Sequence, residues 1–339
     1  MAELRATWGA GWIAGLGPKV MEAENQADMA YSLALNSALG VENNNYTRLF
    51  KDKKTSAARE TMISKTGINY LQETSEGADY NADSRVSGYP VQWNPIKKTS
   101  SIEITEEDKE DRDKDVADKM DEITDLKVSY MMTADKDAFS LFNYAFTAQA
   151  SLPNELTFYA DGVPFCSTVH PIKSTTTSNT TQANASSTGI TLTESNLETA
   201  RQAWRRQNDD KDLPMNIGSG KGILLVPDAL EKTAVIITKS TKRSGTGNND
   251  LNIYDGIFTV ISTKWINSQQ TSGSDTAWFL IDSLHSPAVF LTRRGYKSSI
   301  WQDNKNKNVV YDASFRYQVG NKNWRGVYAS KGDGASYSS

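Results

Sequence analysis

The sequence has little cysteine or histidine. Cys166 is the single cysteine in 339 residues, and His170 and His285 are the only histidines. One cysteine cannot form a disulfide within the chain, and chains without disulfides are typical of reducing compartments. A zinc site would need carboxylates to complete its ligands, because one thiol and two imidazoles do not supply a full set. The sequence therefore predicts neither a disulfide framework nor a metal site.

Long apolar runs and an excess of basic charge are also missing. No stretch approaches the ~20 apolar residues that a membrane-spanning helix needs. The first residues, MAELRATWGAGWIAGL, lack the basic segment and cleavage site of a secretory signal. Lys and Arg number 37 against 41 Asp and Glu, which gives a formal net charge of -4. We therefore expect a protein made in the cytoplasm, without membrane contact and without a general attraction to nucleic acid.

One stretch, 106–147, contains neither Gly nor Pro and repeats its apolar residues at steps of three and four. This spacing places them on one stripe of an α-helix, which at ~1.5 Å per residue would approach ~60 Å. The start is charged all round, whereas the end, AFSLFNYAF, is almost entirely apolar. We predict a spine helix that runs from solvent into a core; a coiled-coil arm or a surface helix is the alternative. The stripe consists of Val116, Met120, Ile123, Leu126, Tyr130, Ala134, Ala138, Leu141 and Ala145.

Two segments precede this helix, and neither has enough apolar residues for a core of its own. Residues 1–66 are interpreted as a mixed arm of short helical turns and loops. Residues 67–105 contain two strand-like runs, 69–73 and 101–105, which predict a long hairpin. Such a hairpin needs a surface to lie on, and a neighbouring molecule is the obvious one; a mobile loop is the alternative. Between the runs lie exposed-looking aromatic residues: Tyr80, Tyr89 and Trp93.

The second half of the chain alternates between helical and strand patterns, which predicts an α+β fold. Its Ser/Thr/Asn tract at 174–188 cannot bury enough apolar surface to fold by itself. Thr193 is a good N-cap for one helix, and Pro227 opens a second helix after a buried strand at 222–226. Further strands are predicted at 257–262, 277–281, 288–291, 309–319 and 324–328.

Two segments could suggest a nucleotide or thiol site. The run 216–222 resembles a phosphate-binding loop, but Met215 stands where that loop needs glycine, and Gly222 where it needs Ser or Thr. Cys166 and His170 are four residues apart, yet flanking prolines exclude the helix that would bring them together. A buried cysteine and a loop histidine are the ordinary interpretation, so we expect no catalytic and no cofactor-binding residue in either segment.

Two charged clusters could suggest ligands as well. The acids within 106–115 lack the glycine and the spacing of a calcium loop, and a solvated helix end or an intersubunit salt-bridge face is expected instead. Trp93 with Lys97 and Lys98 could stack on nucleic acid, but the negative net charge argues against a protein whose main function is to bind nucleic acid. The sequence therefore predicts no enzyme, no cofactor and no metal.

Four motifs follow one another along the chain: DGVPFCSTVHP at 161–171, LTESNL at 192–197, GILLVPDALE at 222–231 and WFLID at 278–282. In this order they resemble the major capsid proteins of tailed bacteriophages with the Hong Kong 97-type fold, most of all the Mu-type major head subunits. The resemblance covers most of 45–330. Cys166 and Val169 depart from the first motif, and the N-terminal arm matches no known segment of that family.

The resemblance implies an α+β capsid subunit in five parts. The parts are an N-terminal arm at 1–66, an extended β-hairpin loop at 67–105, a peripheral-domain spine helix at 106–150, an axial domain at 151–285, and peripheral strands with a C-terminal tail at 286–339. The extended loop would lie on a neighbouring subunit. Loops at 174–188 and 239–250 would meet around five- and sixfold axes, and the apolar end of the helix would pack against the strand at 309–319.

The function implied by the resemblance is self-assembly into the pentamers and hexamers of an icosahedral shell around double-stranded DNA. The particle, a virion, would be assembled in the cytoplasm of a bacterial host. Expected partners are the chain itself, a portal, decoration proteins, and packaged DNA through weak non-specific contacts. The segment before the spine is too short for a large cleavable scaffolding domain, so a separate scaffold protein is expected.

Two alternatives stay open. One is an encapsulin-like compartment, which would enclose a cargo protein instead of DNA and would need no portal. The other is an enzyme or a glycan-binding module built on residues 151–285. In the capsid interpretation, we expect deletion of 75–98 to leave a folded subunit that cannot form stable shells.

Overall fold

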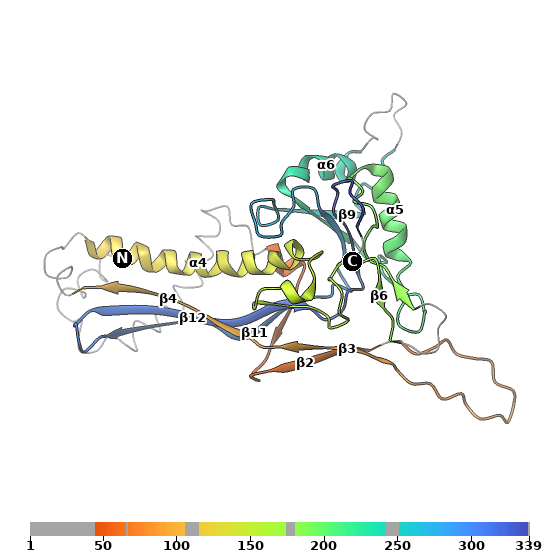
Figure 1. Cartoon of the computed structure of the whole chain (residues 1–339), viewed down its shortest axis with the longest axis horizontal. Helices are drawn as coiled ribbons and strands as arrows, with labels where there is room; N and C mark the ends of the chain where they lie inside the picture. Colours follow the sequence, from red (N-terminus) through yellow and green to blue (C-terminus); the bar gives the residue numbers. More distant parts are fainter. Residues whose placement is uncertain (1–44, 66, 106–114, 174–179, 242–250, 338–339) are drawn as a thin grey trace. The chain divides into compact units, whose positions relative to one another are not determined.

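The computed structural model describes residues 45–65, 67–105, 115–173, 180–241 and 251–337, with only the backbone for 115–124. The described chain mixes helices and strands, as predicted, and divides into two compact units. The smaller unit contains 99–128 and 298–313, and the larger unit contains 45–98, 129–297 and 314–337. Figure 1 labels the principal elements.

In chain order the elements are η1 (Asn45–Arg48), β1 (Lys51–Lys54), β2 (Glu60–Lys65), β3 (Ser87–Trp93), β4 (Ile96–Ile104), α4 (Asp115–Asn143), η2 (Gln149–Ser151), β5 (Leu156–Thr157), β6 (His170–Pro171), β7 (Thr181–Gln182), α5 (Glu194–Arg205), β8 (Gly222–Pro227), α6 (Asp228–Lys239), β9 (Phe258–Thr263), β10 (Trp278–Asp282), β11 (Ala288–Gln302), β12 (Val309–Asn321) and β13 (Val327–Ser330).

The helix α4 is the predicted spine. It ends at Asn143, four residues before the predicted end, and the predicted first turns at 106–114 lie outside the described residues. The apolar stripe is confirmed where side chains are described, because these members of it are buried: Leu126, Ala134, Ala138, Leu141 and Ala145. Phe139 and Phe142 are buried as well, so the end of the helix is enclosed nearly all round.

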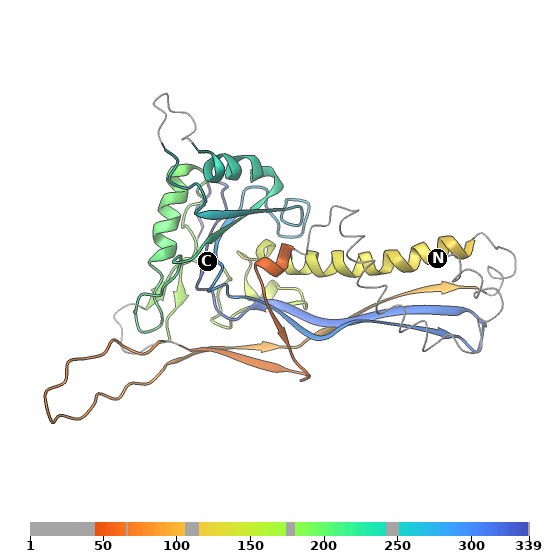
Figure 2. The same cartoon turned by 180° about the vertical axis from the view of Figure 1, so that it is seen from behind.

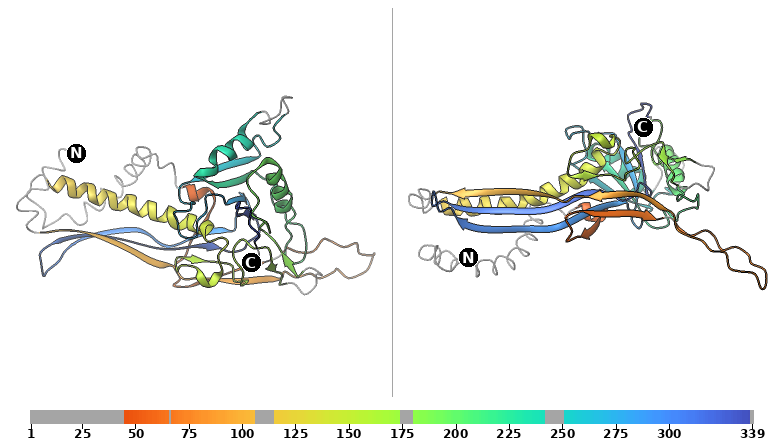
Figure 3. Two further views of the ribbon diagram at one scale, coloured as in Figure 1. Left: turned by 45° about the horizontal axis from the view of Figure 1, so that its top comes forward. Right: turned by 60° about the horizontal axis from the view of Figure 1, so that its bottom comes forward.

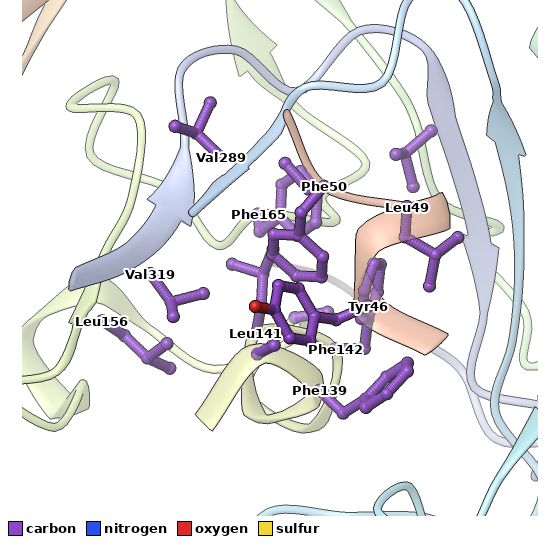
Figure 4. Packing of buried hydrophobic residues seen from close by; sticks show 14 of the residues in the cluster. Tyr46, Leu49, Phe50, Phe139, Leu141, Phe142, Leu156, Phe165, Val289 and Val319 are labelled. Carbon is purple, nitrogen blue, oxygen red and sulfur yellow. The ribbon is translucent and has the colours of Figure 1, made fainter. Parts of the chain in front are cut away.

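The enclosed end of α4 lies in the main core of the larger unit (Figure 4). The ring of Phe142 lies 6.1 Å from that of Phe50, 5.2 Å from that of Phe279 and 6.4 Å from that of Phe165, centroid to centroid. These rings come from the segment after η1, from β10 and from the loop before β6. Aromatic pairs at such distances stabilise a core beyond their buried area.

The returning strand β12 contacts α4 through Tyr130 and Asp137, which precede the apolar end that was predicted to pack on this strand. Phe315 lies edge-on to Tyr130 with centroids 4.7 Å apart. The Tyr317 hydroxyl donates a hydrogen bond to the Asp137 carboxylate, and both groups are buried. Desolvation together with the charge of Asp137 raises the pKa of Tyr317, so this tyrosine stays a donor. The strand and the helix are thus joined by one apolar and one polar contact.

A five-stranded sheet contains β12, and its order is β1-β11-β12-β4 with β5 added to β12. Figure 3 shows β4, β11 and β12 running side by side. Its edge strand β1 pairs in parallel with β11, with Lys51 opposite Val289 and Lys54 opposite Thr292. Residues 45–65 were predicted as part of an arm of short helical turns and loops. The helical turn η1 fits that prediction, but the loops do not, because β1 joins this sheet and β2 is a strand as well. Tyr46, Leu49 and Phe50 are buried in the core.

The predicted hairpin of 69–73 with 101–105 is wrong, and the antiparallel pair in this region is formed by other residues. The antiparallel pair is β2 with β3, in which Glu60 stands opposite Trp93 and Ile63 opposite Pro90. The run 69–73 forms no strand, and 101–104 belongs to β4 in the five-stranded sheet. Trp93 was expected to be exposed, whereas it is 0% exposed and packs in the core.

A second sheet, of order β13-β10-β8-β9, separates two cores. Leu224 and Leu280 belong to the cluster beneath α5 and α6, whereas Leu225 and Phe279 belong to the main core. Figure 2 shows the two helices against this sheet. The prediction is confirmed for this region: Thr193 caps α5 by accepting from the Asn196 amide, and β8 is buried throughout. The last strand lies at 327–330 instead of 324–328.

One buried group in α4 opposes folding and gives a pH-dependent prediction. The Asp135 side chain is 8% exposed, and no described residue hydrogen-bonds its Oδ1. Desolvation raises its pKa from 3.8 to about 6, against the charge of Lys264. Because the folded-state pKa lies above the unfolded value, ionisation destabilises the fold as pH rises through this range, by up to ~3 kcal/mol.

We therefore expect Asp135→Asn to raise the free energy of unfolding by ~1–3 kcal/mol at pH 8 and by little at pH 4. Urea titrations of the unassembled subunit at both pH values measure this difference. The matched control is Asp125→Asn, at an exposed aspartate of the same helix, and it should change stability little at either pH. An equal gain from Asp135→Asn at both pH values would contradict the assigned burial.

Candidate functional site

The most exposed segment of the described chain is the loop 67–86, which connects β2 to β3. From 67 to 85 every residue is exposed, including Leu71 at 99% and Tyr80 at 94%. In Figures 1 and 2 the loop extends away from the β2–β3 pair. Large apolar side chains held this far from a core are typical of a surface that meets another molecule.

Side-chain contacts order this loop in the absence of a strand ladder. The Asn81 amide donates to Gln72 Oε1 at 3.0 Å, from one arm of the loop to the other. At the tip the Ala78 amide donates to the Ser75 carbonyl at 3.1 Å, and Gly77 has a φ of 78 that favours glycine. The loop therefore consists of two arms without strand structure, and polar side chains such as Asn81 and Gln72 join them.

The base of the loop is closed by Asp83 and Lys211. Asp83 accepts from the Asn69 backbone amide at 2.6 Å, which joins the two arms. Lys211 Nζ donates to Asp83 Oδ1 at 2.8 Å and to the Ser84 carbonyl at 2.6 Å. The hydrogen bond from Lys211, followed by the one from Asn69, lowers the pKa of Asp83. The base of the loop is thereby fastened to the turn 208–214.

This turn is held in place by a buried ion pair. Arg325 Nη2 donates to Asp210 Oδ1 at 2.9 Å, and both side chains are buried. Arg325 Nε donates to the Asn208 carbonyl at 2.6 Å, and the guanidinium lies 4.4 Å from the ring centroid of Trp324. On the other side of the turn, the Gly67 amide donates to Asp209 at 2.9 Å. The turn therefore links the loop base to the interior.

Behind Trp324 lies His170 of the 161–171 motif, with the two rings stacked at 4.3 Å. His170 Nδ1 is 2.7 Å from Asp161 Oδ2, and Nε2 is 2.9 Å from Asn184 Oδ1. The amide of Asn184 donates to the Phe165 and Trp324 carbonyls, which turns its oxygen toward the histidine. Both ring nitrogens thus lie within hydrogen-bond distance of side-chain oxygens, which fixes the orientation of the imidazole.

The structure changes how two predicted segments are interpreted. His170 was expected in a loop, but it is buried in β6. Within the tract 174–188, residues 174–179 lie outside the described residues, while Asn184 is fully buried. Sequence reasoning missed Asn184 as the centre of a network, because a Ser/Thr/Asn tract has the composition of a disordered segment.

Cys166 is a packing residue in this arrangement. Its backbone amide donates to the Ala145 carbonyl at 2.7 Å, and its carbonyl accepts from the Tyr337 hydroxyl at 2.8 Å. Burial raises the pKa of its thiol well above the ordinary value, which disfavours the reactive thiolate. The structure therefore does not bring Cys166 and His170 together as a dyad, since the histidine is engaged by Asp161 and Asn184.

The run 216–222 has no open cradle for a phosphate. The Gly218 amide donates to Asp282 Oδ2 at 2.8 Å, so a carboxylate occupies the position that an anion would take. His285 Nδ1 lies 3.1 Å from the same oxygen. This run leads into β8 without opening a helix, as its sequence indicated.

The remaining candidate ligand groups are placed as follows. Trp93 cannot stack on nucleic acid because it is buried, and Lys98 forms an ion pair with Asp137. The acids at 106–114 lie outside the described residues. Among the residues that are described, no group of three or more His, Cys, Asp or Glu is placed to hold a metal ion. A search of the described helices finds none with the length and hydrophobicity to cross a membrane.

Comparison with known families gives the identity of the fold. The phage capsid protein family matches residues 89–330, from β3 through β13. The chain belongs to the phage capsid protein family. This capsid protein is a structural subunit of the virion that associates with copies of itself, as the sequence predicted.

Two solved structures share the fold of this capsid protein. A chain of the mature capsid of bacteriophage PhiM1 superposes with a TM-score of 0.54 at 12% identity, covering 86% of this chain and 87% of that one. A chain of the capsid of Ralstonia phage GP4 gives a TM-score of 0.51 at 12% identity, covering 84% and 87%. No curated protein matches in sequence. The Hong Kong 97-type fold is therefore confirmed, and the closer likeness to Mu-type subunits stays a prediction.

Proposed function

We propose that this capsid protein forms the pentamers and hexamers of an icosahedral shell around double-stranded DNA, and that it acts without catalysis. One observation carries the proposal: the loop 67–86 is ordered and fastened to a buried anchor, yet it presents Leu71 and Tyr80 to solvent. Ordering an exposed loop lowers its conformational entropy, and the fold offsets that cost when the loop binds a partner. A shell of identical subunits supplies such a partner at every position.

The parts of the chain receive distinct roles in this proposal. The loop between β2 and β3 lies on a neighbouring subunit, and the helix α4 with β11 and β12 forms the peripheral domain. Residues 151–285 form the axial domain, whose loops at 174–188 and 239–250 meet around the five- and sixfold axes. Each contact between subunits is small, and stability of the shell comes from their number.

The partners follow from the same proposal. A scaffold protein made as a separate chain would guide assembly in the host cytoplasm, and a portal would admit DNA. Decoration proteins would bind the outside of the finished shell. Contacts with DNA would be weak and non-specific, since the net charge of -4 offers no general attraction to phosphate.

The direct test is to express the chain alone and together with its scaffold protein, and to examine both by size-exclusion chromatography and negative-stain microscopy. Rings or closed shells are the expected products. A stable monomer under both conditions would contradict the proposal. Shells that protect DNA from nuclease in infected cells support a phage head, whereas shells filled with one protein cargo support the encapsulin-like alternative.

A further inference from the structure

The tip of the exposed loop carries charge of one sign. Residues 70–82 contain three acids, Glu73, Glu76 and Asp79, and no Lys or Arg. No described residue forms an ion pair or a hydrogen bond with the carboxylates of these three acids. They share the tip with Leu71 and Tyr80, so the tip offers a negative and partly apolar surface. A partner that fits it must supply positive charge.

Charge of the opposite sign gathers on residues 48–59 of the same chain. This segment contains one acid, Asp52, and the following bases: Arg48, Lys51, Lys53, Lys54 and Arg59. Arg48, Lys54 and Arg59 are exposed, and none of them forms a salt bridge with a described residue, although Lys54 lies near enough to Asp52 for its charge to oppose the rise in pKa that burial causes in that carboxyl. Lysines on an edge strand such as β1 discourage backbone pairing with another chain, yet an exposed ammonium group such as that of Lys54 can still bind an acidic surface.

The basic segment is also crowded with like charges. Burial, followed by the charges of Lys51 and Lys53, lowers the pKa of Lys322, which lies in the turn after β12. Lys51 Nζ donates to the Leu284 carbonyl and Lys53 Nζ to Met62 Sδ, which are neutral partners. Carboxylates brought to this segment would therefore relieve repulsion as well as form new ion pairs.

The two segments cannot meet within one subunit. Residues 48–59 precede the first residue of β2, and the loop leaves from the last residue, Lys65. A strand of this length separates the two by ~20 Å. The contacts of Asp83 and Gly67 with the turn 208–214 then fix the direction of the loop, which Figure 1 shows extending away from the start of β2. The partner of the tip must be another molecule.

We propose that the acidic tip, 70–82, of one copy binds the basic segment, 48–59, of a neighbouring copy. This inference rests on the proposed function, because it names the surface on which the exposed loop lies. Two different surfaces of the same chain meet in this contact, so it is head-to-tail, and repeated contacts of this kind form a ring where the rotation from copy to copy closes. Leu71 and Tyr80 add apolar contact beside the ion pairs.

Charge reversal tests the contact in both directions. The tip variant is Glu73→Lys/Glu76→Lys/Asp79→Lys, and the base variant is Arg48→Glu/Lys54→Glu/Arg59→Glu. Each should weaken the contact about tenfold or more at low salt, because three surface pairs turn from attractive to repulsive. The variant that combines all six changes should regain ring and shell formation, as measured by sedimentation and negative-stain microscopy.

A neutral variant, Glu73→Gln/Glu76→Gln/Asp79→Asn, serves as the control and should assemble at an intermediate level, since attraction is lost without repulsion. Assembly of the wild-type chain tests the proposed function by itself. If the wild type assembles and the charge-reversed variants assemble equally well, the inference is overturned and the proposed function stands. The inference is also overturned if the variant with all six substitutions does not regain assembly although circular dichroism shows that the tip variant and the base variant are both folded.

A disulfide gives a direct readout of the same contact. Glu76→Cys with Lys54→Cys places one thiol on each surface, and the native Cys166 does not interfere because it is buried. Oxidised shells should yield a ladder of linked subunits on a non-reducing gel. Absence of the ladder for this pair and for Asp79→Cys with Arg59→Cys would count against the contact.

Discussion

Replacing residues 70–82 with a short Gly-Ser link should leave the capsid protein folded and abolish its shells. The free energy of unfolding of the isolated subunit should change by less than ~1 kcal/mol, because every removed side chain is exposed. Assembly should fall below detection, since each subunit loses the contact that its loop makes with a neighbour. Urea titration measures the first effect, and negative-stain microscopy in the presence of scaffold measures the second.

The boundaries of this deletion matter. Removing 75–98, as the sequence alone suggested, would take away β3 with Val91 and Trp93, both 0% exposed. Loss of a buried Trp costs ~3–5 kcal/mol, so that variant would fail to fold and would report nothing about assembly. A matched control is Leu71→Ser/Tyr80→Ser, which keeps the length and charge of the loop and should weaken shells without abolishing them. Normal shells from the 70–82 variant would remove the role proposed for the loop.

The elements that could be predicted from the sequence are those with a long and regular apolar period. The helix α4 and the strand β12 are of this kind, because their buried side chains repeat every three to four and every two residues. The strand β8 was predicted as well, since an uninterrupted apolar run bounded by Gly222 and Pro227 fits a strand covered on both faces.

The strands β1 and β3 could not be predicted, for two different reasons. The four residues of β1 are KDKK, and their strand conformation comes from pairing with β11 instead of from burial. In β3 the apolar alternation is interrupted by Gly88 and Pro90. A side chain at Gly88 would place its Cβ 2.3 Å from Ser64 Oγ and 2.5 Å from the Tyr159 hydroxyl, so the glycine is required by a close approach between distant segments.

The network behind the base of the loop could be identified only in part from the sequence, through the motif 161–171 that resembles the capsid family. The partners of that motif were not visible, because Asn184 and Trp324 lie far along the chain and polar networks have no local period. Both positions lie within the residues that match the capsid family, 89–330. In the structure, the motif, the tract around Asn184 and the turn 208–214 meet at one buried point.

The second large effect is expected at that buried point. Arg325→Met should lower the free energy of unfolding by ~3–5 kcal/mol, because it leaves the Asp210 carboxylate buried without its cation. Such a loss is a large fraction of the 5–15 kcal/mol that holds a typical domain together. The measurement is urea unfolding of the isolated subunit, followed by circular dichroism.

A second variant separates the ion pair from simple loss of packing. Arg325→Met/Asp210→Leu removes both charges and should regain most of the lost stability, since a well-packed apolar pair often replaces a buried ion pair without cost. The control is Arg205→Met, at an exposed arginine that ends α5, and it should change stability by less than ~0.5 kcal/mol. Even with stability regained, the double variant has lost the hydrogen bond from Arg325 to Asn208 that holds the turn 208–214. Its loop base should therefore be less firmly placed, and it should form fewer shells than the wild type at equal stability; equal shell yields would show that the anchor serves folding alone.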